Sequence, residues 1–350
     1  MRWFLGLTLV IVVAIIGVLV MPARIDPVSW TPDPDPGLTG PFAPNDELAK
    51  AELLLQGDVI GPEDIACAES GTLYTGLDDG RIIEISVDGS HRELANTGGR
   101  PLGMELDSAG RLIVVDAHRG LLAVSMDGTV EVLADTVNGT KIVFADDLDI
   151  AADGIIWFSD ASMDWGFQEE IYNFLEGRPT GRLLSYNPVN GETSVRMESL
   201  FFANGVAVGP EDEYVLVNET ATGRIHRLWL RGEKAGQRDL FASSLPGTPD
   251  NISFNGSDTF WVALPGLRAS LDANAQQPLV RKLVSHFPED VLQGISKPYP
   301  FVVGLGLDGE VKRNLQNTGE GFNMITSATE CNGSLYLGSL SWPALARYPL

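Results

Sequence analysis

Apolar and polar positions alternate in short runs along most of this chain, and no long stretch after residue 45 has the 3.6-residue period of an amphipathic helix. The apolar runs are rich in Val, Ile, Leu, Trp and Tyr, and each ends at a Gly, Asp or Asn turn. This pattern predicts β-strands. One kind of run occurs six times, at residues 69–77, 108–116, 152–160, 210–219, 255–264 and 331–339.

The spacing of these runs predicts a β-propeller. The turn positions that align them are Gly71, Gly110, Gly154, Asp212, Gly256 and Gly333. They are mostly 39 to 58 residues apart, and the last interval of 77 is enlarged by residues 267–300. Four strands per unit of this length are typical of propeller blades, whereas a β-sandwich does not predict an even six-fold repeat. The sixth unit is short, so we expect the apolar segment 51–59 to supply its outer strand and close the ring.

The N-terminus predicts a membrane anchor. Residues 4–21 carry no charge, and 18 apolar residues are about the length that crosses a bilayer. The alternative is a cleaved signal peptide, but Met21-Pro22-Ala23 is a poor cleavage site. We therefore expect an all-β, six-bladed β-propeller preceded by a single N-terminal transmembrane helix, with the N-terminus cytoplasmic and the propeller extracytoplasmic.

Three segments follow from this reading: an anchor at 1–25, a linker at 26–45 and the propeller at 46–350. Six prolines between residues 26 and 45 favour an extended spacer that holds the propeller away from the membrane. The 350 residues include 47 acidic and 24 basic side chains, a net charge of −23 that would repel phosphate backbones and argues against a nucleic-acid partner.

Polar residues recur at one position of the repeat. Glu63, Asp146 and Asn204 each lie eight residues before the turn of their unit, where two other units have Leu102 and Ile325. In the fifth unit, Asp250 and Asn251 lie six and five residues before the turn. Equivalent positions of a propeller meet at one mouth of the central channel. Oxygen ligands without His or Cys favour a hard divalent cation, above all Ca²⁺. The alternative is that these are turn and capping residues.

Several segments together give a family resemblance. They read GPEDIA (61–66), GRPLGMELDSAGRLIVVDAHRGLL (99–122), FADDLDI (144–150), GRLLSYNP (181–188), FANGVAV (202–208), LPGTPDNI (245–252) and LYLGSL (335–340). In this order they resemble the strictosidine synthase-like family. The resemblance implies a six-bladed propeller and, in the wider superfamily of gluconolactonases and paraoxonases, a channel calcium whose ligands carry over to Glu63, Asn204 and Asp250. Relatives usually have Asn where this chain has Asp146.

Two departures from the family bear on chemistry. The catalytic Glu of the true synthases is replaced by Thr326, which disfavours a strictosidine synthase-like condensing reaction. Relatives often have Tyr where this chain has His118, so His118 is a candidate for a catalytic or substrate-contacting role, with a structural loop histidine as the alternative.

The resulting hypothesis is a membrane-anchored, calcium-dependent hydrolase of small-molecule esters or lactones, an activity class also attributed to an animal member of the family. Asp250 is the first candidate for the general base and His118 the second. The alternative is a non-catalytic, membrane-tethered binding module whose metal only holds the blades together.

Two further features of the sequence bear on the rim of the propeller. Trp165, Phe167 and Tyr172 interrupt the strand pattern, where they could line an apolar substrate pocket or pack among themselves. Cys67 and Cys331 fall in neighbouring blades, so a disulfide is possible, but they match no disulfide framework and we do not predict one.

Overall fold

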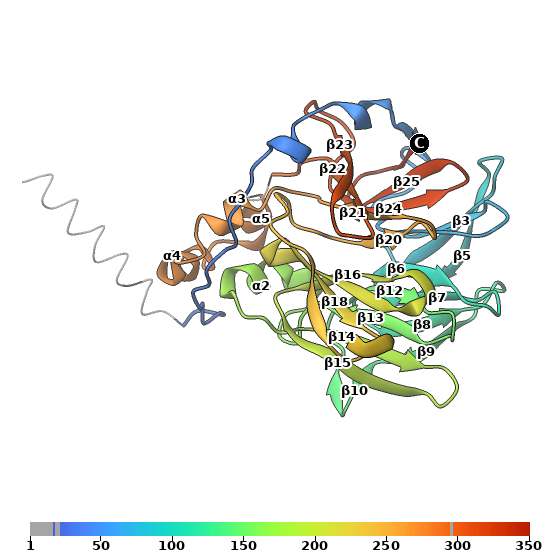
Figure 1. Ribbon diagram of the computed structural model, residues 1–350, viewed down its shortest axis with the longest axis horizontal. Helices are drawn as coiled ribbons and strands as arrows, with labels where there is room; N and C mark the ends of the chain where they lie inside the picture. The colour runs from blue at the N-terminus through green and yellow to red at the C-terminus, as the bar shows by residue number, and fades with distance from the viewer. Residues whose placement is uncertain (1–16, 18–21, 295–296) are drawn as a thin grey trace, which may run out of the picture.

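The computed structural model describes residue 17, residues 22–294 and residues 297–350. Six four-stranded antiparallel sheets form the molecule, with a two-stranded ribbon of β10 (Thr136–Val137) and β11 (Thr140–Lys141) at one edge. The innermost strand of each sheet contacts the innermost strands of its neighbours, and β2 contacts both β6 and β24. The sheets therefore close into a ring, which confirms the six-bladed β-propeller (Figure 1).

Each blade runs outward from the channel in chain order, except for the last. Blades 1 and 2 consist of β2 (Ile65–Cys67), β3 (Leu73–Gly76), β4 (Arg81–Ile85), β5 (His91–Asn96), β6 (Pro101–Leu106), β7 (Leu112–Asp116), β8 (Gly120–Val124) and β9 (Val130–Ala134). Blades 3 and 4 consist of β12 (Ala145–Ile150), β13 (Ile156–Asp160), β14 (Gly181–Asn187), β15 (Glu192–Leu200), β16 (Ala203–Val208), β17 (Tyr214–Glu219), β18 (Arg224–Trp229) and β19 (Arg238–Ala242). Blade 5 consists of β20 (Ile252–Phe254), β21 (Thr259–Ala263), β22 (Phe301–Gly306) and β23 (Val311–Gln316).

Blade 6 joins the two ends of the propeller. Its inner strands are β24 (Ile325–Cys331), β25 (Ser334–Ser339) and β26 (Leu345–Pro349), and its outer strand is β1 (Glu52–Leu54). Glu52 pairs with Arg347 and Leu54 with Leu345 in an antiparallel register. The expected closure of the ring by the segment 51–59 is therefore confirmed.

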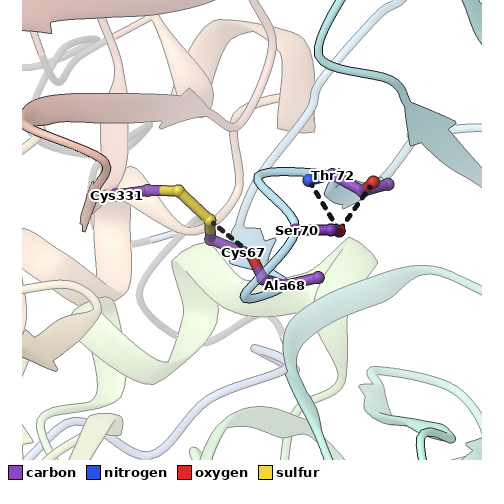
Figure 2. The surroundings of a disulfide bond; sticks show 5 residues. All are labelled: Cys67, Ala68, Ser70, Thr72 and Cys331. Carbon is purple, nitrogen blue, oxygen red and sulfur yellow. Dashed lines mark hydrogen bonds between the residues drawn. A yellow bond between two sulfur atoms is a disulfide. The ribbon is translucent and has the colours of Figure 1, made fainter.

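A disulfide also connects blades 1 and 6. Cys67, the last residue of β2, is bonded to Cys331, the last residue of β24, and 264 positions separate the two in sequence (Figure 2). The sequence made this bond possible by placing the cysteines in neighbouring blades, but we did not predict it because the two cysteines match no disulfide framework.

The α-helices that follow β1 in the described chain lie in the insertions of blades 3 and 5. Blade 3 contributes α2 (Glu170–Glu176), and blade 5 contributes α3 (Ala269–Asp272), α4 (Pro278–Val284) and α5 (Glu289–Gln293). Figure 1 shows these helices gathered at one side of the propeller. Both insertions leave from the end of a second strand, β13 or β21, and return to the start of a third. That end of each blade is the end at which its innermost strand begins, so the helices lie on the face where the innermost strands start.

The Pro-rich segment lies against the propeller, unlike the spacer that its composition predicted. Trp30 makes an edge contact with Phe201, at 5.2 Å between ring centroids. Arg224 binds Asp33 through two hydrogen bonds of 2.6 Å. Phe42 is buried in the blade 4–5 core. These contacts make the Pro-rich segment part of the folded propeller unit.

The predicted membrane helix over residues 4–21 lies outside the described residues, apart from Gly17. In the parts of the chain that the structure describes, none of the helices has both the length and the apolar character needed to span a bilayer.

Candidate functional site

Six pairs of consecutive residues surround one mouth of the channel. The innermost strands of blades 2, 3, 4 and 6 each contain a register shift, between Pro101 and Met104, Ala145 and Leu148, Ala203 and Val206, and Ile325 and Ala328. A β-bulge of this kind re-aims the side chains at that point. The pairs at these shifts are Leu102-Gly103, Asp146-Asp147, Asn204-Gly205 and Thr326-Ser327, and the matching pairs Glu63-Asp64 and Asp250-Asn251 directly precede β2 and β20.

The second residues of these pairs hold neighbouring blades together. Asp64 accepts a hydrogen bond from the Met104 amide at 3.0 Å, so it joins blades 1 and 2. Asp147 accepts one from the Val206 amide at 2.8 Å, which joins blades 3 and 4. The pairs therefore lie at a fixed height in the channel, set by contacts between strands.

Thr326 has a structural role in this ring. Its hydroxyl donates to the Glu63 carbonyl oxygen at 2.8 Å, and its own carbonyl accepts from the Asn251 amide at 3.0 Å. Blades 5, 6 and 1 are thus linked through one residue. The position of the synthase acid is occupied by a side chain whose hydroxyl is already committed to a backbone oxygen.

The first residues of the pairs leave oxygens without partners. Glu63, Asp146 and Asn204 are 2%, 4% and 4% exposed. Among the described residues, Glu63 Oε2, Asp146 Oδ2 and Asn204 Oδ1 have no hydrogen-bond partner, and the same holds for Asn251 Oδ1. The other Glu63 oxygen accepts from Asn251 Nδ2 at 3.0 Å. Because buried oxygens normally have partners, these four indicate a missing positive or hydrogen-donating group.

The carboxylates also raise one another's pKa. Burial raises the pKa of Glu63 well above its usual range, and the nearby charges of Asp250, Asp64 and Asp146 raise it further. The pKa of Asp146 is raised by burial and then by Asp250. Burial also raises the pKa of Asp250 to about 8. A cation bound among these groups would offset both the desolvation and the repulsion.

The donor set fits a hard cation through mixed carboxylate and amide oxygens. Within residues 22–294 and 297–350, no group of three or more Asp, Glu, His or Cys side chains is arranged to hold a metal ion. The predicted ligands, which combine carboxylates with the amide oxygens of Asn204 and Asn251, therefore stay a prediction. The described oxygens match the chemistry of calcium, which binds carboxylates and amide carbonyls together.

Asp250 differs from its neighbours in exposure and in how its backbone is held. It is half-buried, whereas Glu63 and Asp146 are enclosed. Its carbonyl oxygen accepts hydrogen bonds from the Gly205 amide and from the Asn218 side chain, both in blade 4. A Cβ added to Gly205 would collide with that carbonyl, so blade 4 needs glycine there to approach blade 5.

His118 lies in the loop that follows β7, on the face of the propeller where the innermost strands begin. Its Nε2 is 3.0 Å from Gln168 Nε2, and its ring packs edge-on against Phe167 at 6.0 Å between centroids. The His118 amide donates to Asp116 Oδ1 at 2.9 Å. These contacts tie His118 to the blade 3 insertion, and none of its hydrogen bonds within the described chain reaches the candidate ligands.

The three aromatic residues predicted for a substrate pocket divide into two groups. Phe167 packs beside the apolar cluster of Leu102, Ala117, Phe144, Ala161 and Phe202. Leu102 is the first residue of the blade 2 pair at the channel mouth. Trp165 and Tyr172 lie 5.2 Å apart in another cluster, under α5 and the N-terminal segment. Trp165 also donates to Glu176 at 2.8 Å, and Tyr172 is 3% exposed. Only Phe167 is therefore placed near the channel.

Two charged residues near the mouth were not singled out by the sequence. Arg100 is 1% exposed, donates to the Gly61 carbonyl at 2.9 Å, and lies 5.7 Å from the centre of the Phe167 ring. Glu170 begins α2, and burial raises its pKa to about 7 while Arg100 lowers it. Its charge also raises the pKa of Asp146 and of Asp250. Glu170 lies in an insertion, so no repeat position could have identified it.

Acidic residues continue further along the channel. A cavity of about 100 Å³ is lined in part by Asp64, Glu105, Asp147 and Asp149. Burial and then the nearby charge of Asp149 raise the pKa of Glu105 to about 8. A larger hollow of about 380 Å³ lies between blades 3 and 4, lined by residues such as Asp153, Trp157 and Arg231. It contains none of the predicted site residues, so the chemistry that we consider belongs to the channel mouth.

Comparisons with known proteins agree with this architecture. A strictosidine synthase family model matches residues 146–233, and a model of the strictosidine synthase-like N-terminal region matches residues 40–85. Adipocyte plasma membrane-associated protein of Rattus norvegicus is 32% identical over 373 residues, covering 99% of both chains. The protein of the same name from Gallus gallus is 34% identical and covers 99% of this chain and 89% of its own. Strictosidine synthase-like 6 of Arabidopsis thaliana is 33% identical over 301 residues, covering 84% and 80%.

Solved structures with the same fold are more distant in sequence. A gluconolactonase from Xanthomonas campestris superposes with a TM-score of 0.63 at 20% identity, covering 95% of this chain and 99% of its own. The calcium-binding protein regucalcin from Agrobacterium tumefaciens gives a TM-score of 0.57 at 12% identity, covering 85% and 92%. At these identities the likeness establishes the shared fold.

Proposed function

This chain belongs to the strictosidine synthase-like family, and on that basis we propose that it is a membrane-anchored, calcium-dependent hydrolase of esters or lactones. The observation that carries the proposal is the set of unpartnered oxygens of Glu63, Asp146 and Asn204 at one channel mouth. The gluconolactonase that shares the fold supports the reaction class.

The proposed metal ligands are Glu63, Asp146, Asn204, Asp250 and Asn251. A calcium ion bound there would polarise the carbonyl oxygen of the substrate. The regucalcin that shares the fold is itself described as calcium-binding, which favours this ion. Phe167 lies beside the mouth, where its ring could orient an acyl group, and the buried Arg100 lies 5.7 Å from the centre of that ring.

Asp250 is the residue that we assign as general base. As a residue Asp250 is partly exposed, whereas Glu63 and Asp146 are enclosed, so we choose it as the first of the three carboxylates to take a proton from water. Hydrogen bonds from blade 4 to its carbonyl fix the backbone that carries it. His118 is the second candidate, because it lies on the same face of the propeller with one ring nitrogen held by Gln168.

Thr326 argues against a condensing reaction. That reaction needs an acid at this position, and the Thr326 hydroxyl is occupied by the Glu63 carbonyl. The remaining alternative is a tethered binding module whose metal only stabilises the ring.

An extracytoplasmic location is part of the proposal. The disulfide between Cys67 and Cys331 is of a kind that persists in oxidising compartments. Relatives from rat and human are named as plasma membrane-associated. The uncharged run at residues 4–21 supplies a segment of suitable length for an anchor.

Turnover of phenyl acetate and of a lactone panel, with calcium and with chelator, tests the function. Asp250→Asn keeps the size and one oxygen of the side chain but removes its basicity, so we expect kcat to fall about a hundredfold. Asp308→Asn, in an exposed turn of blade 5, is the matched control. A larger loss in His118→Phe would reassign the base. A protein that binds calcium in a titration but turns over no substrate would instead be the binding module.

A further inference from the structure

The blade 5 insertion carries a cluster of exposed apolar side chains. Leu279, Val280, Phe287 and Val291 are 63%, 38%, 56% and 49% exposed. They lie within thirteen residues on α4, α5 and the turn between them, and we call them the apolar patch. The other large apolar side chains exposed in the described chain are spread over strands, turns and loops. Isolated exposed apolar residues are normal, but a cluster marks an interaction surface.

The opposite side of these helices is already fixed to the propeller. Arg281 is 2% exposed and donates to the Leu175 carbonyl at the end of α2, at 2.8 Å. Leu292 is fully buried with Tyr172 and Ile25. Since the inward sides of α4 and α5 are used for these contacts, the helices cannot turn the apolar patch inward without losing them.

The patch lies beside the start of the described chain. Arg24 binds Glu289 of α5 at 2.9 Å, and Ile25 packs against Leu292. The uncharged run at 4–21 ends only three residues before Arg24. Figure 1 shows α4 and α5 next to the dark blue stretch that begins at residue 22. A membrane that receives this run would therefore lie close to the patch.

The charges near the patch suit the headgroup region of a bilayer. Lys282 of α4 and Lys297 beyond α5 form no salt bridge with any residue in the described parts of the chain. Lysine side chains next to exposed apolar groups are typical of surfaces that lie in the membrane interface. The net charge of −23 favours an uncharged lipid surface over an acidic one.

We propose that the apolar patch inserts into the surface of a phospholipid bilayer and thereby turns the channel mouth toward the membrane. The insertion leaves blade 5 at Ala263 and returns at Phe301, on the same face as α2 and the channel mouth. Substrates of this site would then be esters or lactones that partition into lipid. The inference rests on the proposed anchor and hydrolase, and it adds the orientation of the site and the polarity of its substrates.

Depth-dependent fluorescence quenching tests the orientation in the full chain. A bimane label is placed at Leu279→Cys or Phe287→Cys, and at Val189→Cys as a control, since Val189 is 91% exposed in the β14–β15 turn at the opposite end of blade 3. The protein is incorporated into phosphatidylcholine vesicles that contain acyl-brominated lipid. We expect quenching at 279 and 287 to be at least threefold greater than at 189. Equal quenching at all three sites, in protein that floats with the vesicles, would refute insertion of the apolar patch into the bilayer but would leave the anchor hypothesis intact.

A second measurement separates the patch from the anchor and from catalysis. Protein that does not float with vesicles would overturn both the anchor and this inference. Replacing Leu279 and Phe287 together by Ser should leave phenyl acetate turnover unchanged but lower turnover of a long-chain ester in vesicles about tenfold. If this variant turns over both substrates at the wild-type rate, the assignment of lipid-partitioned substrates is overturned. Crosslinking of two copies through residue 279, without quenching, would show that the patch binds a second chain instead.

Discussion

Removing the Cys67–Cys331 disulfide is expected to lower the stability of the propeller substantially. The bond closes a loop of 264 residues. The chain-entropy relation gives about 5.6 kcal/mol for such a loop at 25 °C, and native disulfides of small domains contribute roughly 2–5 kcal/mol. We therefore expect the Cys67→Ser, Cys331→Ser double variant to lose about 3–5 kcal/mol. With roughly 2.1 cal/mol/K of unfolding entropy per residue over about 300 residues, this loss lowers Tm by about 5–8 °C.

Differential scanning calorimetry of wild type and the double variant, with and without reductant, measures this effect. Reductant should lower the Tm of the wild type by about the same amount and leave the double variant unchanged. Replacing both cysteines leaves β1 paired with β26, so the ring should still close. A double variant that melts within 1 °C of wild type would show that this pairing, and not the disulfide, determines the stability of the closed ring.

Two further perturbations test other parts of the molecule. A chain that starts at Pro22 should fold. A chain that starts at Asp46 should melt at least 5 °C lower on heating followed by circular dichroism, because it lacks the buried Phe42 and the Trp30 contact with Phe201. Equal Tm values for the two chains would show that residues 26–45 act as a free spacer. Burial raises the pKa of Glu105 from about 4.5 to about 8, so the folded state binds this proton more tightly than the unfolded chain does, and stability should fall as pH rises between these values. In chelator, Glu105→Gln should flatten that part of the Tm–pH curve, and an unchanged slope would assign it to other carboxyls.

The blade repeat was predictable because each turn needs a small or polar residue at a fixed place. Gly71, Gly110 and Gly154 all have positive φ and mark the turn between the first two strands of their blades. The same alignment placed Glu63, Asp146 and Asn204 at equivalent heights in the channel, where the structure leaves their oxygens unpartnered. Ring closure by residues near 52 followed from counting strands, because the sixth unit lacked one.

Features that depend on contacts between unlike segments were not predictable. The 26–45 segment has the composition of a spacer, yet Asp33 and Phe42 find specific partners on blades 4 and 5. Glu170 lies close enough to Arg100 for its pKa to be lowered because an insertion of blade 3 folds back over blade 2, and an insertion has no counterpart in the repeat. The disulfide was not predictable either, because the expected closure of the ring places Cys67 and Cys331 in neighbouring blades but does not fix the distance between their side chains.

The shared sixth blade also affects when this protein can finish folding. β1 and β26 are the first and last of the described strands in chain order, and they lie side by side in one sheet. A ribosome delivers them in that order, so the outer strand of blade 6 must wait, unpaired, while the five other blades are synthesised. If the propeller is exported, its β1 edge crosses the membrane long before β26 does. The complete ring can therefore close only after β26 has been synthesised, and until then the exposed strand edge and the unpaired Cys67 need protection from wrong partners.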